Sequence, residues 1–325
     1  YRKSGSINRQ GFNSLEMMKR QRNVFITGAS GYLGQYLADE LVKSQKTVIA
    51  LTHKSPLPDE LSEVKQVKGS LSNFDWSKLE SDLPDVIFHT ARMAGKNRQQ
   101  RKIAALQNRK ANESLLQWLG SLPRPPLLVF VSGTLVYGSH GESVVDESVQ
   151  PDPISFQREY FEAEKPILEK MNSGKLPIVI VRPPWIYGPG SWLKAFYLNP
   201  AKKSGYVPVY GKGDNLMNFV HVRDVAGMTM HVAEKNPKNG IYNITSDATL
   251  TQKEFGLKLA ELSNLNIRHK PLWWMRLRFD KAVAEAFGFS LNVTTEHKSL
   301  FADYRFYYPD FDEGLKEVLT CEKLR

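Results

Sequence analysis

Three glycines near the start of the chain are spaced so that they could hold a phosphate group. Residues 27–34 read TGASGYLG and place Gly28, Gly31 and Gly34 between a short apolar run and a helix-like segment. A strand must turn tightly there into a helix whose N-terminal amides face a pyrophosphate, and larger side chains would obstruct both the turn and the phosphate. We therefore predict a dinucleotide site; an ordinary glycine-containing turn is the weaker interpretation.

The residues that would determine whether NAD or NADP binds lie at the end of the next strand-like run. The chain reads Thr52-His53-Lys54 at a place where a carboxylate would bind a ribose hydroxyl and a cation would pair with a 2′-phosphate. With two cation candidates and no carboxylate, the sequence favours NADP, with NAD as the alternative. A solvated turn is also compatible with these residues.

Strand-like and helix-like segments alternate along the first half of the chain and must position these groups. The apolar runs are 24–26, 47–51, 86–89, 127–131 and 178–181, and the helical spacings are 32–41, 103–119 and 159–171. This alternation predicts an α/β protein with a doubly wound parallel sheet, the Rossmann fold. Beyond residue 185, turn clusters rich in Pro, Gly and aromatic residues predict a smaller, interleaved C-terminal substrate-binding region.

The predicted domain boundaries follow from these changes in residue composition and hydrophobic pattern. Residues 1–16 are polar and read as a tail or an expression remnant, and residues 17–185 form the dinucleotide-binding domain. Residues 186–325 form mainly the substrate-binding region. Within them, the segment 218–247 returns to the large sheet, because 240–245 is again strand-like.

The composition excludes several classes of protein. The formal charge is +10, but Lys and Arg are interspersed with Asp and Glu, so we expect no nucleic-acid partner. No apolar run is long enough for a membrane span, and the chain reads as cytoplasmic. The single Cys321 excludes an internal disulfide, and no spacing of His, Asp and Glu indicates a metal site.

Five further segments carry a resemblance to a known family. They are 85–91 (DVIFHTA), 108–116 (NRKANESLL), 131–138 (VSGTLVYG), 181–189 (VRPPWIYGP) and 218–225 (NFVHVRDV). Together with the glycine turn, and over most of residues 23–250, the chain resembles the extended short-chain dehydrogenase/reductases. Residues 211–219 are most similar to the 3β-hydroxysteroid dehydrogenase branch.

The resemblance implies a catalytic tyrosine followed four residues later by a lysine on the same helix face. Lys165 has a suitable place, but the residue four before it is Phe161, and Tyr160 is its neighbour. The usual Ser or Thr falls on Gly133, which Ser132 and Thr134 flank. Lys165, Tyr160, Ser132 and Thr134 are therefore the catalytic candidates, while packing or capping roles for the three hydroxyls stay open.

The resemblance also assigns cofactor contacts along the chain, with Ser70 standing where the family commonly has an aspartate. The implied cofactor-binding residues are Gly28, Ser30, Gly31, Tyr32, Leu33, Gly34, Thr52, His53, Lys54, Ser70, Leu71, Thr90, Ala91, Arg92, Asn108, Lys165 and Pro184.

The substrate implied by the sequence is a hydrophobic small molecule. Nucleotide-sugar enzymes of the family carry an arginine where this chain has Met217 and Asn218, so the phosphate clamp is missing. Aromatic residues in 271–275, 287–289 and 301–308 could line an apolar pocket, or could simply form core. A membrane-surface helix around Trp273 and Trp274 is a less favoured interpretation.

Three hypotheses follow. The first is an NADP-dependent oxidoreductase that interconverts a ketone and a secondary alcohol on a hydrophobic molecule. The second is an epimerase, dehydratase or rearrangement enzyme of the same family. The third is an NADP-binding sensor or partner protein without catalysis, and a homodimer is compatible with each.

Overall fold

A parallel sheet of seven strands forms the larger part of the molecule. The computed structural model describes residues 23–95, 97–235, 237–246, 248–279 and 281–323, so the tail predicted for residues 1–16 lies outside the described residues. The strand order is β11-β7-β5-β4-β1-β2-β3, and every pairing is parallel. The strands are β1 (Asn23–Thr27), β2 (Thr47–Thr52), β3 (Lys65–Lys68), β4 (Val86–His89), β5 (Leu127–Val131), β7 (Ile178–Arg182) and β11 (Gly240–Asn243).

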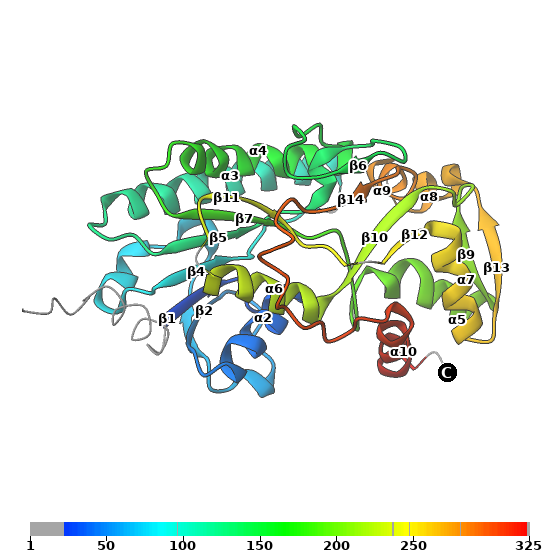
Figure 1. Cartoon of the computed structure of the whole chain (residues 1–325), viewed down its shortest axis with the longest axis horizontal. Helices are drawn as coiled ribbons and strands as arrows, with labels where there is room; N and C mark the ends of the chain where they lie inside the picture. Colours follow the sequence, from blue (N-terminus) through cyan, green and yellow to red (C-terminus); the bar gives the residue numbers. More distant parts are fainter. Residues whose placement is uncertain (1–22, 96, 236, 247, 280, 324–325) are drawn as a thin grey trace, which may run out of the picture.

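Helices cover both faces of this sheet. Helices α2 (Tyr32–Lys43) and α6 (Val222–Lys235) lie on one face, and α3 (Arg98–Ser121) and α4 (Ser155–Asn172) lie on the other (Figure 1). Strand β1 shows why both faces are apolar, since Val24 and Ile26 pack beneath α2 and α6 whereas Phe25 packs toward α3 and α4. The doubly wound α/β fold predicted from the sequence is confirmed.

Two of the predicted helices are longer than their apolar patterns. The helix predicted over 103–119 spans Arg98–Ser121, because the side chain of Asn97 caps it by accepting a hydrogen bond from the amide of Gln100 at 3.0 Å. The helix predicted over 159–171 spans Ser155–Asn172. The first turn of α3 is polar, and that of α4 has a single apolar residue, Phe156, so hydrophobic periodicity does not reach either turn.

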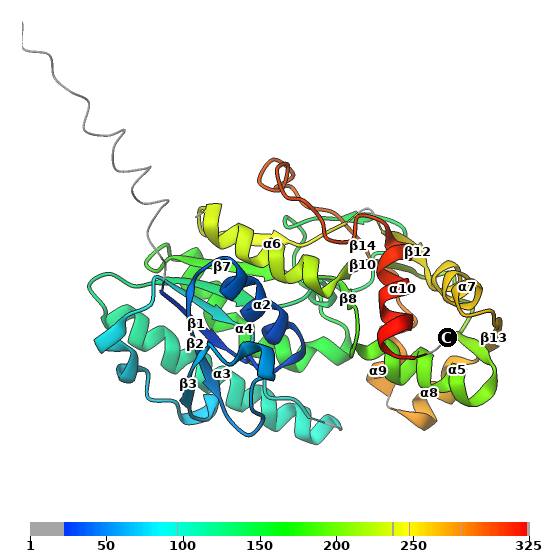
Figure 2. The ribbon, with the colours of Figure 1, turned by 90° about the horizontal axis from the view of Figure 1, so that it is seen from below.

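A smaller lobe lies beside the carboxyl ends of the large sheet (Figure 2). Its sheets are β12-β10-β8 and β13-β9, and a third pair joins β14 to β6. Their strands are β6 (Val144–Val145), β8 (Trp185–Tyr187), β9 (Tyr206–Tyr210), β10 (Leu216–His221), β12 (Thr249–Thr251), β13 (Asn266–Lys270) and β14 (Asn292–Val293). Besides α6, the α-helices after β8 are α5 (Asn199–Ser204), α7 (Gln252–Leu262), α8 (Leu272–Arg278), α9 (Lys281–Ala286) and α10 (Phe311–Cys321).

The chain passes between the two parts more than once. Strand β10 belongs to the lobe, α6 follows it directly and packs against α2, and β11 pairs with β7 at the edge of the large sheet. The short helices are η1 (Asp59–Leu61), η2 (Leu71–Asn73), η3 (Trp76–Asp82), η4 (Thr134–Tyr137) and η5 (Lys194–Leu198). None of the described helices is long and apolar enough to cross a membrane.

Candidate functional site

The glycine loop lies at the carboxyl end of β1, where the strand order reverses. Strands β2 and β4 flank β1, so the two halves of the sheet diverge there and leave a crevice in which such folds bind ligands. Gly28 has φ +76°, and a Cβ on it would lie 2.7 Å from the amide nitrogen of Ala91. A Cβ on Gly34 would lie 2.0 Å from the Gly28 carbonyl oxygen. The backbone geometry therefore requires glycine at both positions.

The start of α2 fits a dinucleotide phosphate. Gly31 is the N-cap of this helix, and among the described residues no side chain caps its first amides. Uncapped amides and the positive end of the helix dipole together form an anion site. Ser30 lies in the same turn, whereas Tyr32 packs toward Gly188, and Leu33 packs on the core beneath the helix.

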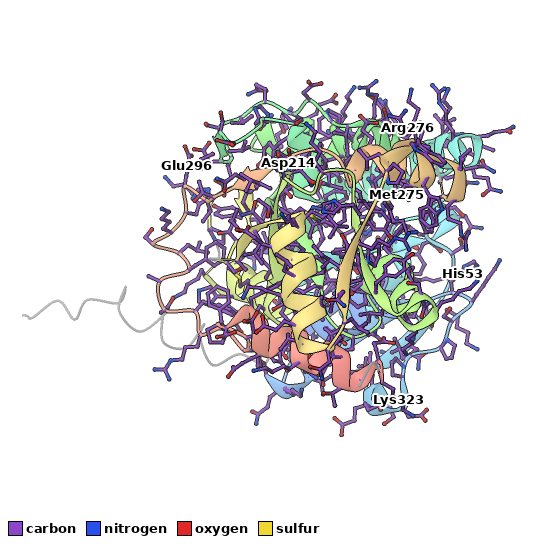
Figure 3. The ribbon with its side chains drawn as sticks, turned by 90° about the vertical axis from the view of Figure 1, so that its right-hand side faces the viewer. His53, Asp214, Met275, Arg276, Glu296 and Lys323 are labelled. Carbon is purple, nitrogen blue, oxygen red and sulfur yellow. The ribbon has the colours of Figure 1, made fainter. Side chains whose placement is uncertain are left out.

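The far end of the crevice fits a nucleoside. The hydroxyl of Thr52 is buried and has no hydrogen-bond partner among the residues that the structure describes, so a ribose hydroxyl could satisfy it. His53 and Lys54, which follow Thr52, are exposed, and His53 lies near the right-hand edge of the view in Figure 3. The Ser70 hydroxyl lies 3.0 Å from that of Ser72, and Leu71 is buried.

A buried chain of hydrogen bonds joins the end of β1 to helix α4. The Ala91 amide donates to the Thr27 hydroxyl at 3.3 Å, and the Thr27 oxygen lies 2.6 Å from Nδ1 of His89. On its other side, His89 Nε2 lies 2.9 Å from Oδ1 of Asn112. Because the Asn112 amide nitrogen donates to the Ala163 carbonyl at 2.7 Å, its oxygen must accept the proton of His89 Nε2.

This network fixes His89 as a neutral positioning residue. Burial lowers the pKa of His89 to about 4, so the ring carries no charge at neutral pH. Thr90, next in the chain, donates its hydroxyl to the Thr27 carbonyl at 2.7 Å. The network thus holds the loop after β4 against the glycine loop.

The side chain of Asn108 also holds the loop that follows β4. Its Oδ1 accepts the Met93 amide and its Nδ2 donates to the Met93 carbonyl, each at 2.9 Å. Both polar atoms of this predicted cofactor ligand are therefore bonded to backbone. Asn108 positions the loop that carries Ala91 and Arg92.

Helix α4 presents Tyr160 and Glu164 to the interior. Both are buried, at 7% and 2% exposed, and four residues separate them, so they share one face. Lys165 follows Glu164 by one residue, which rotates it by about 100° around the helix. Its side chain is 43% exposed, and its ammonium pairs with Glu162 at 2.6 Å. The structure therefore brings Tyr160 to the inner face and leaves Lys165 at the surface.

Arg92 contacts Tyr160 across the crevice. Its guanidinium carbon lies 4.1 Å from the centre of the Tyr160 ring, within the range of a cation–π contact. Arg92 comes from the loop that Asn108 clamps, whereas Tyr160 comes from α4. The two sides of the crevice thus meet at a phenol and a cation.

Glu164 is a buried residue that sequence reasoning missed. It accepts a hydrogen bond from Arg182 Nη2 at 2.8 Å, and both side chains are almost fully buried. It also accepts the hydroxyl proton of Ser132. The guanidinium of Arg182 further lies 4.9 Å from the centre of the Tyr137 ring. Ser132 therefore points its proton away from the crevice and toward an ion pair.

The remaining predicted catalytic positions are at the end of β5. Thr134 is buried, and its amide donates to the Pro183 carbonyl at 3.0 Å. Gly133 has extended backbone, with φ −178°, and a Cβ on it would meet only the Pro183 carbonyl oxygen at 3.7 Å. A Cβ atom at Gly133 would thus meet its nearest neighbour only at ordinary van der Waals distance. Pro184 is half-buried in the loop that follows.

A pocket of about 590 Å³ opens in the smaller lobe between α5, β9, β13 and α8. Its walls include Tyr206, Tyr210, Trp274 and Phe279, and cations stand at its rim. These cations are Lys203, Lys270 and Arg278, and the lining contains no carboxylate. The pocket is therefore suited to an apolar ligand, and to an anionic group at its rim.

Tilted aromatic contacts lead from this pocket into the core of the molecule. The ring centres of Phe279 and Phe196 are 4.7 Å apart, and those of Phe196 and Phe287 are 4.8 Å apart. Phe287 in turn lies 5.3 Å from Trp185, which packs against the same core cluster as Phe156. The aromatic residues predicted to line a pocket thus serve partly as lining and partly as core.

The fold and the glycine site together define a dinucleotide-binding protein of the Rossmann class. The family model for the NAD dependent epimerase/dehydratase family matches residues 24–245. The chain belongs to this family.

Relatives and solved structures resemble the chain at low identity. Short-chain dehydrogenase/reductase family 42E member 1 of Danio rerio is 25% identical over 236 residues, which cover 68% of this chain but only 60% of that protein. Sterol-4-alpha-carboxylate 3-dehydrogenase, decarboxylating, of Dictyostelium discoideum is 22% identical over 72% of this chain and 74% of its own. Human epimerase family protein SDR39U1 with NADPH superposes with a TM-score of 0.73 at 20% identity, covering 92% of this chain and 99% of that one.

Proposed function

We propose that this chain is an NADP-dependent oxidoreductase that interconverts a ketone and a secondary alcohol on a hydrophobic small molecule. The observation that carries the proposal is the contact of Arg92 with Tyr160, in which the guanidinium carbon lies 4.1 Å from the centre of the ring. It places a proton-bearing phenol next to a positive charge. Such a pair can protonate a carbonyl oxygen and stabilise the phenolate that is left.

In the proposed reaction the cofactor is the source of the hydride and Tyr160 is the source of the proton. The reduced nicotinamide supplies a hydride to the carbonyl carbon when it is bound. Tyr160 gives its hydroxyl proton to the carbonyl oxygen, so a ketone becomes a secondary alcohol, and solvent then returns a proton to the phenolate. Arg92 stabilises the phenolate and holds the ring by its contact with the π face. Ser132 and Glu164 fix the wall beside them.

Three observations support the cofactor and the substrate class. The end of β2 carries His53 and Lys54 and no carboxylate, which favours a 2′-phosphate. The pocket of the smaller lobe has aromatic walls. Among the relatives, the Dictyostelium protein is named as a dehydrogenase of a sterol-4-alpha-carboxylate, and a sterol skeleton is apolar.

A nucleotide-sugar substrate is less well supported. Met217 is 1% exposed, and it stands where sugar enzymes of the family carry a phosphate-binding arginine. The Asn218 amide is also occupied, because its nitrogen donates to the Thr249 hydroxyl at 2.5 Å and its oxygen accepts the Val293 amide at 2.6 Å. Neither side chain is free to bind a phosphate.

The test begins with binding and continues with turnover. Protein fluorescence would be titrated with NADPH and NADH, and NADPH oxidation would then be followed with a panel of hydrophobic ketones. We expect NADPH to bind at least tenfold more tightly than NADH, and Lys54→Glu to remove that preference. Tight binding without turnover of any ketone, or of any alcohol with NADP⁺, would overturn the proposed reaction.

The second candidate is a cofactor-binding protein without catalysis. Two observations favour it: Lys165 pairs with Glu162 at the surface, and Gly133 offers no hydroxyl. Under this proposal NADPH would raise the melting temperature, and Tyr160→Phe would change neither that shift nor any rate. The variant therefore separates the two candidates.

A further inference from the structure

Helix α8 exposes two large apolar side chains on one face. Trp273 is 60% exposed and Leu277 is 79% exposed, and their spacing of four residues places them side by side. Met275 is fully buried and anchors the helix, while Trp274 turns into the pocket of the smaller lobe. Isolated exposed apolar residues need no explanation, but an adjacent tryptophan and leucine on one short helix do.

The segment that contains this face is cationic. Residues 262–279 contain four Arg and Lys residues and no Asp or Glu, and the cations are Arg268, Lys270, Arg276 and Arg278. None of the four forms an ion pair with a carboxylate within the described part of the chain. Lys270 lies instead over the Tyr206 ring at 5.1 Å and over the Trp274 ring at 5.8 Å.

The geometry presents Arg276 on the outer side of α8, next to the apolar face. Arg276 projects outward from α8, whereas Met275 points into the lobe (Figure 3). Arg276 and Arg278 flank Leu277 in the chain and are both exposed. An apolar strip bordered by unpaired cations is typical of a helix that lies in the headgroup region of a bilayer.

We propose that helix α8 docks this chain on an anionic phospholipid surface. Trp273 and Leu277 enter the boundary between headgroups and acyl chains, and Arg276 contacts a lipid phosphate. Binding is shallow and reversible, because only two apolar side chains enter the bilayer. The proposal does not depend on the proposed enzymatic function.

Two other occupants fit this surface less well. A second copy of the chain in a symmetric contact would bring the four cations of each α8 segment against those of its partner. A nucleic acid would pair with the cations but would leave Leu277 without an apolar partner. An anionic lipid surface satisfies both features at once.

The experiment is vesicle co-sedimentation of the whole chain without cofactor or substrate. Vesicles of phosphatidylcholine alone are compared with vesicles that also contain phosphatidylglycerol, at low and at physiological salt. We expect binding that needs phosphatidylglycerol and weakens with salt. Arg276→Gln should lower the affinity about fivefold, the loss expected for one cation near an anionic surface. The double variant W273S/L277S should lower it at least tenfold.

The matched control is I103S/L106S on helix α3. Ile103 and Leu106 are 50% and 64% exposed and have cations as neighbours, so their replacement changes surface hydrophobicity to a similar degree. This control should bind vesicles as the unaltered chain does. Equal binding to both vesicle types, or unchanged binding by W273S/L277S, would overturn the proposal. So would a dimer, seen by sedimentation velocity, that W273S/L277S dissociates.

Discussion

The stability of this protein should fall steeply between neutral and mildly acidic pH because of His89. Burial lowers the pKa of His89 to about 4 from an ordinary value of 6.5. Below the ordinary value the unfolded chain takes up a proton that the folded chain refuses, so the folded state loses stability as the pH falls from about 6.5 to about 4. At about 1.4 kcal/mol per pH unit, the loss reaches roughly 3 kcal/mol across this window.

Urea unfolding of the unaltered chain and of His89→Gln measures this contribution. Glutamine can still donate toward Asn112 but does not titrate, so its variant lacks this source of pH dependence. Between pH 7 and about pH 5, the unaltered chain should lose roughly 2 kcal/mol more than the variant does. Equal losses in the two proteins would refute the assignment of His89 as a buried neutral residue.

Three other predictions concern single positions. Glu164→Leu should cost about 3–5 kcal/mol in urea unfolding, because it leaves Arg182 buried without its partner; if it costs less than about 1 kcal/mol, the ion pair is not what holds this wall. Gly34→Ala should weaken NADPH binding at least tenfold by displacing the phosphate loop, whereas Gly120→Ala, with open space around its Cβ, should bind normally; equal affinities would contradict the close packing of the loop. Gly133→Ser should raise the turnover of a ketone, since the added Cβ meets its nearest neighbour only at ordinary contact distance and the hydroxyl restores the residue type usual in the family; an unchanged rate would show that this hydroxyl is not what limits the reaction.

The large sheet could be predicted because its strands are continuous apolar runs. Parallel strands buried on both faces leave that pattern in any sequence, and the glycines at 28, 31 and 34 announce the turn that follows β1. The helix boundaries were harder to predict, since the first turn of α3 is polar and that of α4 has Phe156 as its one apolar residue. The Asn97 cap was the available signal for α3.

The residues on the inner face of α4 were harder to predict from the sequence than the strands of the large sheet. The resemblance predicts a catalytic lysine at Lys165. Phe161, four residues earlier, then stands where the family has its catalytic tyrosine. The apolar residues Ile167 and Met171 point inward, and counting back from them by helical steps leads to Tyr160 and Glu164. A buried glutamate is rarely predicted, because a charge is seldom buried unless it is paired, and the partner of Glu164, Arg182, lies on strand β7 and not on the same helix.

The pair of Arg92 and Tyr160 could not be predicted from spacing. The two residues lie 68 positions apart, and their contact depends on the loop that Asn108 and the His89 network hold. Sequence reasoning named both residues for separate reasons, one as a cofactor ligand and one as a displaced hydroxyl. Only the folded arrangement of β4, its loop and α4 joins them.

The most direct test of the proposed mechanism compares Tyr160→Phe with Lys165→Ala in NADPH-dependent ketone reduction. NADPH affinity would be measured for both variants, so that a change in rate can be separated from a change in binding. We predict that Tyr160→Phe lowers kcat at least a hundredfold with NADPH affinity within about twofold of the unaltered chain, the range expected for loss of a general acid. Lys165→Ala should keep its activity. Full activity in Tyr160→Phe together with loss of activity in Lys165→Ala would contradict the proposed roles.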